Sequence, residues 1–158
     1  HRCDMRTLAE IQNPPRSRHF FTTLGRSIQT AVVCGRVMVV HLGAVSSPED
    51  VALIADFLLT YEHAEWSFCT GRSRGNLYLS LRTGKPHAKA SDVLRAIVND
   101  PDEAGGHGGV AGGRVSVGLA TTEEEWQDLE QTLQARLARR LRLPARASFR
   151  RVFVDTAG

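Results

Sequence analysis

Apolar residues recur at helical spacing in four segments of the chain. In SSPEDVALIADFLLTYE, residues 46–62, we expect Ser47 as the N-cap, Pro48 as the first helical residue and Asp50 as the second member of a capping box. A helix is also predicted over residues 16–29, where two prolines precede a segment with one apolar side. Both segments therefore have one face suited to packing against other elements.

The other two helical segments lie in the second half of the chain. KASDVLRAIVND, residues 89–100, is expected to begin at a Ser91 cap and to end where a proline follows. TTEEEWQDLEQTLQARLARRL, residues 121–141, has Thr122 as its N-cap and Glu125 in position to complete a capping box. The second of these segments therefore predicts a long amphipathic helix.

Four segments have the composition or the alternation of β-strands. Residues 30–43 are rich in β-branched side chains and predict one long strand or a hairpin broken at Gly35. Residues 64–84 predict a hairpin with a glycine-bearing turn, residues 114–120 a strand, and residues 147–158 a short edge strand or a tail. The order of elements predicts a single α/β domain, with a mixed sheet of about five strands and helices packed on it.

Side chains alternate between two faces along the second arm of the 64–84 hairpin. Three leucines point one way, and Tyr78, Ser80 and Arg82 share the opposite face. We interpret Asp56 as a residue on the exposed side of its helix, and His41 as a core or strand-end histidine. Neither is expected to act in acid–base catalysis.

Composition argues against a membrane span and a disulfide framework. The 158 residues are 42% hydrophobic and 23% charged, and no apolar run approaches the roughly 20 residues of a membrane helix. Cys3, Cys34 and Cys69 are widely scattered without metal-finger spacing, so we expect a cytoplasmic protein with neither disulfide nor zinc site. The sequence lacks a signal peptide and an initiator methionine, so we expect a piece of a longer chain.

The charge is unevenly distributed although the net charge is only +3. Residues 131–154 contain seven arginines and no acid, whereas acids gather in residues 123–130. One interpretation is a helix whose acids lie at its N-terminus and bases at its C-terminus, as the helix macrodipole favours. The other interpretation is a face that attracts phosphates, and the sequence leaves both open.

AGGHGGVAGG, residues 104–113, holds six glycines and one histidine. Glycines permit positive φ and close approach of a ligand, so consecutive N–H groups can converge on one anion while His107 donates to a phosphoryl oxygen. We therefore expect an open phosphate-binding loop, with a surface loop whose glycines are merely tolerated as the alternative. A Walker loop is excluded because no G-K-[ST] follows, and a dinucleotide fingerprint because the run lies between a helix and a strand.

The glycine run resembles the G-G-G-H-x-x-A-A-G signature of the DHH-associated domain, the C-terminal half of DHH-family phosphoesterases. The matching residues are Gly105, Gly106, His107, Ala111 and Gly112. Ala104 stands in place of the first glycine of the signature and Val110 in place of its first alanine. The flanking elements are similar to that domain from about residue 30 to 140, and the helix at 16–29 resembles the segment that joins the two halves.

The resemblance implies a division of labour between two halves. The N-terminal half of these enzymes holds two manganese or magnesium ions on aspartates and histidines, including an Asp-His-His tripeptide, and hydrolyses a phosphoester with a metal-bound hydroxide. The associated half closes over that site and holds the substrate's phosphate and terminal nucleotide. Since this chain contains no Asp-His-His, it resembles the substrate-binding half, with no catalytic residue and no metal ligand of its own.

The same resemblance implies roles for individual residues. The expected phosphate-binding residues are Gly105, Gly106, His107, Arg82, Ala111 and Gly112, and the weaker candidates are Ser80, Gly108, Arg72 and Arg74. His107 would hydrogen-bond one phosphoryl oxygen, and Arg82 would pair bidentately with another. Arg72 and Arg74 in the hairpin turn are interpreted as solvated loop residues, with contact to a nucleic-acid backbone as the alternative.

The resemblance predicts a substrate-binding domain of a metal-dependent DHH phosphoesterase. The substrates would be short single-stranded oligonucleotides or nucleotide phosphates, as for oligoribonucleases, 3′-phosphoadenosine-phosphate phosphatases and exopolyphosphatase-related proteins. We expect a linker and connecting helix (1–29), the associated domain (30–141) and a basic tail or edge strand (142–158). The expected partners are the N-terminal DHH catalytic domain, the substrate and a second copy in a homodimer. A stand-alone RNA-binding module without a hydrolytic partner is the alternative, so whether the chain belongs to an enzyme stays open.

Overall fold

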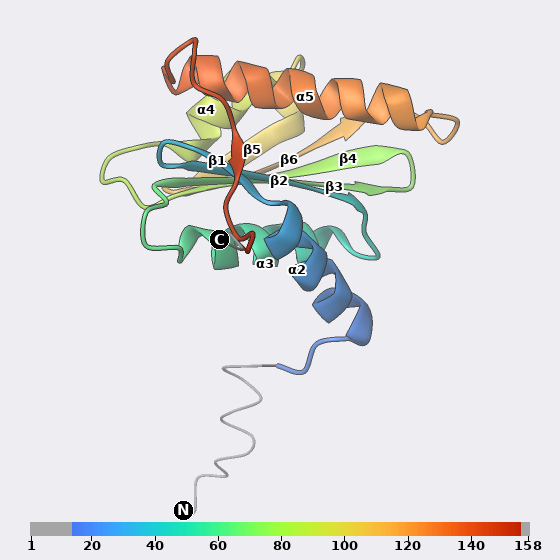
Figure 1. Ribbon diagram of the computed structural model, residues 1–158. Helices are drawn as coiled ribbons and strands as arrows, with labels where there is room; N and C mark the ends of the chain where they lie inside the picture. Colours follow the sequence, from blue (N-terminus) through green and yellow to red (C-terminus); the bar gives the residue numbers. More distant parts are fainter. Residues whose placement is uncertain (1–13, 156–158) are drawn as a thin grey trace, which may run out of the picture.

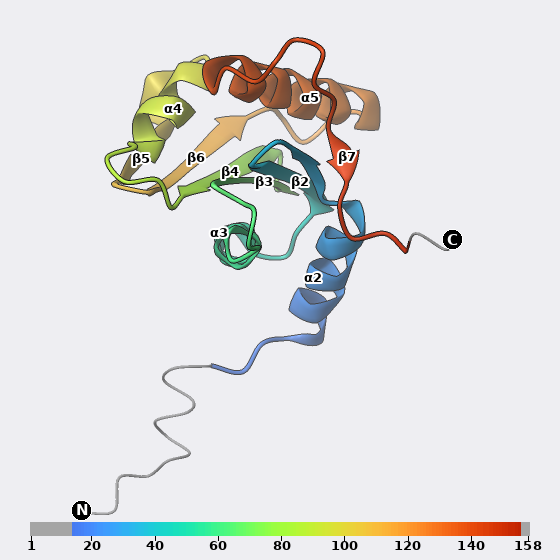
Figure 2. The ribbon, with the colours of Figure 1, turned by 60° about the vertical axis from the view of Figure 1, so that its left-hand side comes forward.

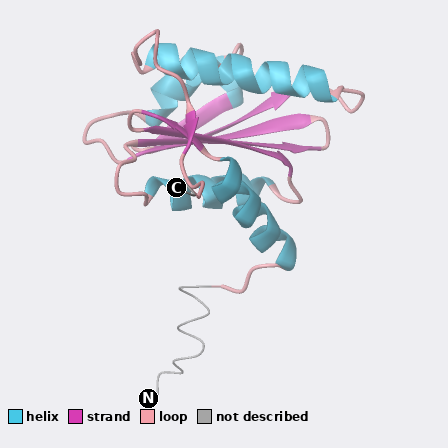
Figure 3. Ribbon diagram, viewed as in Figure 1, coloured by secondary structure: helices cyan, strands magenta, loops and turns pink. Residues whose placement is uncertain are grey.

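The computed structural model describes residues 14–155 and has three layers. Helices α2 and α3 cover one face of a central sheet, and α4 and α5 cover the other (Figures 1 and 3). The helices are α2 (Arg18–Thr30), α3 (Pro48–Leu59), α4 (Ala90–Ile97) and α5 (Glu123–Arg140), with a 3-10 turn η1 (Pro101–Glu103) after α4. The predicted single α/β domain is confirmed. Residues 1–13, which the predicted linker includes together with Cys3, lie outside the described residues.

The sheet has seven strands, not the five expected. They are β1 (Val32–Cys34), β2 (Val37–Ala44), β3 (Trp66–Ser73), β4 (Asn76–Thr83), β5 (Ala104–His107), β6 (Val110–Ser116) and β7 (Arg150–Arg151). Their order is β5-β6-β4-β3-β2-β1-β7. Neighbours pair antiparallel except β2 and β3, which are parallel and joined by the crossover helix α3. The expected number was too small mainly because the glycine run itself forms β5 and the start of β6.

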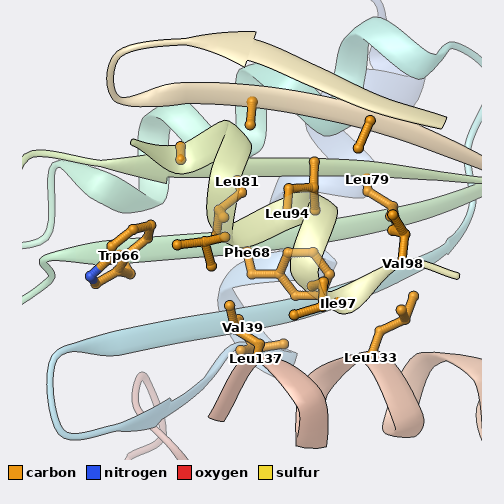
Figure 4. Packing of buried hydrophobic residues seen from close by; sticks show 14 of the residues in the cluster. Val39, Trp66, Phe68, Leu79, Leu81, Leu94, Ile97, Val98, Leu133 and Leu137 are labelled. Carbon is orange, nitrogen blue, oxygen red and sulfur yellow. The ribbon is translucent and has the colours of Figure 1, made fainter. Parts of the chain in front are cut away.

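One hydrophobic core lies between the sheet and helices α4 and α5. Phe68 of β3 and Leu79 and Leu81 of β4 pack there against Leu94 and Leu137, as Figure 4 shows. Each of these five side chains is at most 2% exposed, and burying a side chain of this size contributes roughly 1.5–3 kcal/mol. The predicted alternation along β4 is thereby confirmed for its leucine face.

A second core lies on the opposite face, under α3. Met38 and Val40 of β2 pack there with Ile54 and Leu58, and the side chain of Cys69 is buried among them. Burial raises the pKa of the Cys69 thiol, because the apolar surroundings disfavour the thiolate. Cys69 is therefore a core residue and not a nucleophile.

Two of the predicted helix starts are confirmed. In α5 the N–H of Glu125 donates to Thr122 Oγ1 at 3.2 Å, and the N–H of Thr122 donates to Glu125 Oε2 at 2.9 Å, which is the predicted capping box. Ser47 is the N-cap of α3, and its hydroxyl accepts a hydrogen bond of 3.2 Å from the N–H of Glu49. The capping box expected with Asp50 does not form. Local side-chain chemistry therefore determines where these helices begin.

Helix α4 begins differently. It starts at Ala90 without a side-chain cap, so the predicted Ser91 cap is wrong. A tertiary contact replaces the cap, because the N–H of Ala90 donates to the carbonyl oxygen of Gly108 at 3.0 Å. The glycine run thus supplies the acceptor for the first N–H of the helix. Within residues 14–155, no helix combines the length and the apolarity needed to cross a membrane.

The C-terminal segment forms a short edge strand, one of the two structures expected for it. β7 pairs with β1 at the edge of the sheet opposite β5 (Figure 2). The guanidinium of Arg151 donates to the carbonyl oxygen of Gln29 through Nη2 at 2.6 Å and Nε at 3.1 Å. This pairing ties the end of the described chain to the end of α2.

Candidate phosphate-binding cleft

The glycine run is a β-hairpin and not an open loop. Its arms pair from Ala104 opposite Gly113 to His107 opposite Val110, with a two-residue turn between them. Gly108 in that turn has φ +58°, the left-handed conformation that glycine adopts without strain. The hairpin lies at the edge of the sheet beside α4 (Figure 2). The expectation of a main chain held open throughout residues 104–113 is therefore wrong.

The tip of this hairpin is docked between the end of β4 and the start of α4. The carbonyl oxygen of Gly109 accepts a hydrogen bond of 2.9 Å from the N–H of Thr83, and that of Gly108 accepts the bond from Ala90 already described. A Cβ on Gly109 would collide with the carbonyl oxygen of Thr83. Glycine is therefore required at the tip for close packing of two main chains.

Hydrogen bonds across the hairpin occupy alternate main-chain amides of β5. In a two-residue hairpin the flanking pair, here His107 and Val110, exchanges both of its hydrogen bonds, and so does the pair two residues further, Gly105 and Gly112. The N–H of Gly106 therefore points away from β6, toward an edge where no further strand lies among the described residues. β5 offers this amide to a ligand in place of the predicted row of consecutive amides.

A cleft of about 640 Å³ opens at this edge, between residues 84–89, the first turns of α4 and the hairpin. This volume lies within the usual range for small-molecule sites. The titratable side chains that line it are Lys85, His87, Lys89, Asp92, Arg95 and His107. Cationic groups and histidines thus outnumber the one acid, and the cleft favours an anionic ligand.

His107 and Arg95 offer donors at the hairpin side of the cleft. His107 is exposed, and its ring makes no hydrogen bond or ion pair with the described residues. Arg95 crosses the edge of β5, where its Nε donates to the carbonyl oxygen of Ala104 at 3.1 Å. Its two terminal nitrogens have no partner among residues 14–155 and remain available to a ligand.

Arg82 is held in place next to the hairpin. The register sets Arg82 beside Val110 and Val110 beside His107, so two strand spacings, about 10 Å, separate the Cα atoms of Arg82 and His107. Arg82 Nε donates to Asp56 Oδ1 at 2.6 Å, and Nη1 donates to the carbonyl oxygens of Leu81 at 3.1 Å and of Ala111 at 2.9 Å. Only Nη2 lacks a partner among the described residues.

The pairing with Asp56 makes Arg82 a rigid donor. Its side chain is 9% exposed, whereas that of Asp56 is 57% exposed. Because three hydrogen bonds fix the guanidinium, little side-chain entropy remains to be lost when an anion binds at Nη2. Asp56 lies on the exposed side of its helix, as the sequence predicts, and it also orients this arginine.

Three other predicted residues, Ala111, Ser80 and Gly112, contribute little to a ligand surface, whereas Gly108 lines the cleft. Ala111 is fully buried in the core under α4, and Ser80 is 5% exposed on β4. Gly112 is paired in the hairpin opposite Gly105, and Gly108 lies in its turn. Ala111 matches the signature because a small side chain packs there, and not because it can reach a ligand.

The structure does not bring Arg72 and Arg74 to the cleft. Arg72 is opposite Leu77, five residues along β4 from Arg82, which corresponds to about 17 Å. Its Nη2 contacts Glu130 Oε1 at 2.5 Å and its Nη1 contacts Glu123 Oε2 at 2.6 Å. Burial opposes the charge of Arg72, but these hydrogen bonds outweigh it and raise its pKa. Arg72 therefore attaches α5 to the sheet.

A buried polar cluster continues from this ion pair. His41 Nδ1 lies 2.7 Å from Thr70 Oγ1 and its Nε2 lies 2.8 Å from Gln134 Oε1. Burial lowers the pKa of His41, although Gln134 and Glu130 partly oppose this. His41 is therefore a neutral structural histidine, in agreement with the prediction of a core or strand-end role.

Sequence reasoning overlooked several residues of the cleft. Lys85, His87 and Lys89 stand within five positions of one another, and this local concentration of basic groups was a usable signal. Arg95 and Asp56 carried no such signal, because their roles depend on β5 and β4 being brought beside their helices. Within residues 14–155, no three His, Cys, Asp or Glu side chains gather as a metal-ligand group. The arrangement is suited to holding an anion.

The sequence has limited similarity to known proteins. No family model matches the chain. An uncharacterized protein of Methanocaldococcus jannaschii is 24% identical over 132 residues, which cover 83% of this chain and 27% of that protein. The chain thus spans about a quarter of the length of this curated relative.

Two solved structures are similar in backbone. An exopolyphosphatase-related protein from Bacteroides fragilis superposes with a TM-score of 0.62 at 16% identity, covering 87% of this chain and 41% of that one. The C-Ala domain of alanyl-tRNA synthetase from Aquifex aeolicus gives a TM-score of 0.44 at 18% identity, covering 66% of this chain and 97% of that one. The first similarity shows that the architecture described above occurs as part of a larger protein.

Proposed function

We propose that this chain is the substrate-binding part of a metal-dependent DHH-type phosphoesterase acting on short single-stranded oligonucleotides or nucleotide phosphates. The observation that carries the proposal is the basic cleft, with His107 beside it and Arg82 held two strands away. The fold shared with an exopolyphosphatase-related protein supports the same class of chemistry. Of the signature residues, Gly106 and His107 line this cleft.

The residues of the cleft would bind and orient the substrate. The N–H of Gly106 and the imidazole of His107 are donors on β5, and Lys85 and Arg95 add positive charge to the cleft. Arg82 Nη2 is a further donor on β4, two strands away and outside the lining of the cleft. The imidazole of His107 would donate a hydrogen bond to a phosphoryl oxygen. Charge-assisted hydrogen bonds of this kind are about twice as strong as neutral ones.

Hydrolysis itself belongs, in this proposal, to an N-terminal catalytic half of the same polypeptide. That half would hold two manganese or magnesium ions, which supply the metal-bound hydroxide. The described part of this chain would supply no metal ligand and no catalytic residue. Its contribution would be to fix the phosphoester against the partner half.

Replacing His107 by alanine tests the proposal. Since His107 makes no hydrogen bond within the described structure, the fold should keep its Tm, while affinity for a short phosphorylated oligonucleotide should fall by about 1–3 kcal/mol, roughly 5- to 150-fold in Kd. His19→Ala, an exposed histidine on α2, is the matched control and should bind like the parent. Equal affinity of His107→Ala and the parent chain in calorimetry would refute the assignment.

The alternative is a stand-alone RNA-binding module, which a basic cleft would also serve. Such a module would bind long RNA with strong salt dependence and without preference for a free end. A phosphoesterase domain would instead prefer short oligonucleotides with one free end. Titration of matched short and circular single strands separates the two.

A further inference from the structure

The cleft continues along the surface to the C-terminal end of α5. Lys85 lines the cleft and also a second hollow of about 390 Å³, whose wall includes Arg36, Arg140 and Arg142. Arg140 and Arg142 in turn line a third hollow of about 480 Å³, together with Arg136 and Arg139. Since neighbouring hollows share these side chains, the three form one continuous surface, which we term the basic track.

Positive charge dominates the basic track. Eight lysines and arginines line it, against the two acids Glu65 and Asp92. Glu65 lies 3.7 Å from Arg36 and 3.9 Å from Lys85, distances too long for strong pairing. No acid lines the third hollow.

Three arginines at or just beyond the C-terminal end of α5 have no polar partner within the described residues. Arg139, Arg140 and Arg142 are exposed, and their guanidinium groups make no hydrogen bond or ion pair with residues 14–155. Arg136 differs, because its Nη1 donates to the carbonyl oxygen of Ile97 and to Asn99 Oδ1, both at 3.0 Å. The unpaired guanidiniums are therefore available to an external anion.

The helix macrodipole does not account for the whole arrangement. It favours Arg139 and Arg140, which are in the last turn of α5. Arg142 lies beyond the helix, Arg36 lies in the turn between β1 and β2, and Lys85 follows β4. Cations from three separate segments of the chain thus lie on one surface. Stabilisation of the C-terminal end of α5 by its macrodipole would not require the cations from the other two segments.

We propose that the basic track binds the backbone of a single-stranded nucleic acid, beyond the phosphate held in the cleft. This inference rests on the proposed function, and it adds that affinity grows with the length of the strand. The hollows are far larger than a bare phosphate group and are open to solvent, so each has room for a sugar and a base beside the phosphate.

Recognition along the track would be independent of base sequence. Among Phe, Tyr and Trp, the residue that lines it is Trp66, which is 6% exposed and packed in the core. Without an exposed Phe, Tyr or Trp ring among the lining residues, the track lacks the large stacking surfaces of sequence-tolerant aromatic platforms. Arginines therefore contact phosphates, and the interaction depends strongly on salt.

Calorimetric titration with a 5′-phosphorylated dinucleotide and octanucleotide tests the proposal. The parent chain should bind the octanucleotide at least about tenfold more tightly than the dinucleotide. The double variant Arg140→Gln with Arg142→Gln should lose this advantage while binding the dinucleotide normally, and its salt slope for the octanucleotide should fall by about 1.4, because two phosphate contacts disappear. Arg16→Gln with Arg18→Gln, which removes the same charge from exposed positions at the start of α2, should behave like the parent.

His107→Ala separates the two proposals in the same assay. It should weaken both oligonucleotides by a similar factor and leave their ratio unchanged. If it does so while the Arg140 and Arg142 double variant keeps the parent ratio, the proposal for the basic track is refuted and the proposed function of the cleft is retained. If His107→Ala binds both strands like the parent, the proposed function fails. Weaker binding of inorganic polyphosphate with unchanged binding of the octanucleotide in the double variant would also overturn the track.

Discussion

Replacing Glu130 by glutamine is expected to destabilise the fold by about 2–4 kcal/mol, because it breaks the ion pair that attaches α5 to the sheet. Glu130 is 2% exposed. Its carboxylate accepts two hydrogen bonds from Arg72, one from Nε at 3.1 Å and one from Nη2 at 2.5 Å. Glutamine retains one acceptor oxygen but sets an NH₂ group against the guanidinium, so the bidentate pairing is lost.

The magnitude follows from what remains around Arg72. Removing one member of a buried ion pair costs about 3–5 kcal/mol when the other charge is left alone. Arg72 keeps a bond of 2.6 Å to Glu123, and its guanidinium carbon lies 5.6 Å from the ring centre of Trp126. The Glu123 side chain is 65% exposed, so this remaining pair offsets only up to about 1 kcal/mol. In a domain of this size the Tm should fall by about 4–16 °C.

Urea unfolding followed by circular dichroism measures the change. Asp128→Asn, an exposed acid on the same helix, is the control and should stay within about 0.5 kcal/mol of the parent. The double variant Arg72→Met with Glu130→Leu removes both charges and should recover most of the loss. A loss below about 1 kcal/mol for Glu130→Gln, or a double variant as unstable as Glu130→Gln, would refute the reasoning.

Two further predictions concern the hairpin tip and the buried histidine. Gly109→Ala should lower the free energy of unfolding in urea by about 1–3 kcal/mol and weaken oligonucleotide binding, because the new Cβ meets the carbonyl oxygen of Thr83. Gly25→Ala, with open space around it in α2, is the control and should instead raise the free energy of unfolding by about 0.5–1 kcal/mol. Burial lowers the pKa of His41 from 6.5, so below that pH the unfolded chain binds more protons and stability should fall as the pH decreases. His41→Gln should flatten this dependence, and an unchanged pH profile of unfolding in that variant would contradict the role given to His41.

The glycine run shows why part of the candidate site escaped the sequence. Strands are recognised by alternating apolar and polar side chains and by β-branched residues, and glycine supplies neither signal. The hairpin forms because β6 pairs with β4 and because the tip at Gly108 and Gly109 satisfies main-chain groups of Ala90 and Thr83. These partners are distant in sequence, so the pattern of the run could suggest a ligand site but not its shape.

The local sequence alone determined much of the secondary structure. The capping box of Thr122 and Glu125 and the alternation of leucines in β4 depend on residues within a few positions of each other, so the printed sequence already contains them. The tertiary structure alone decided the partners of the arginines. Arg82 meets Asp56 across 26 positions and Arg72 meets Glu130 across 58, and both pairs exist only because a helix covers each face of the sheet. Whether an arginine supports the fold or is free to bind phosphate therefore depends on packing, which no local pattern encodes.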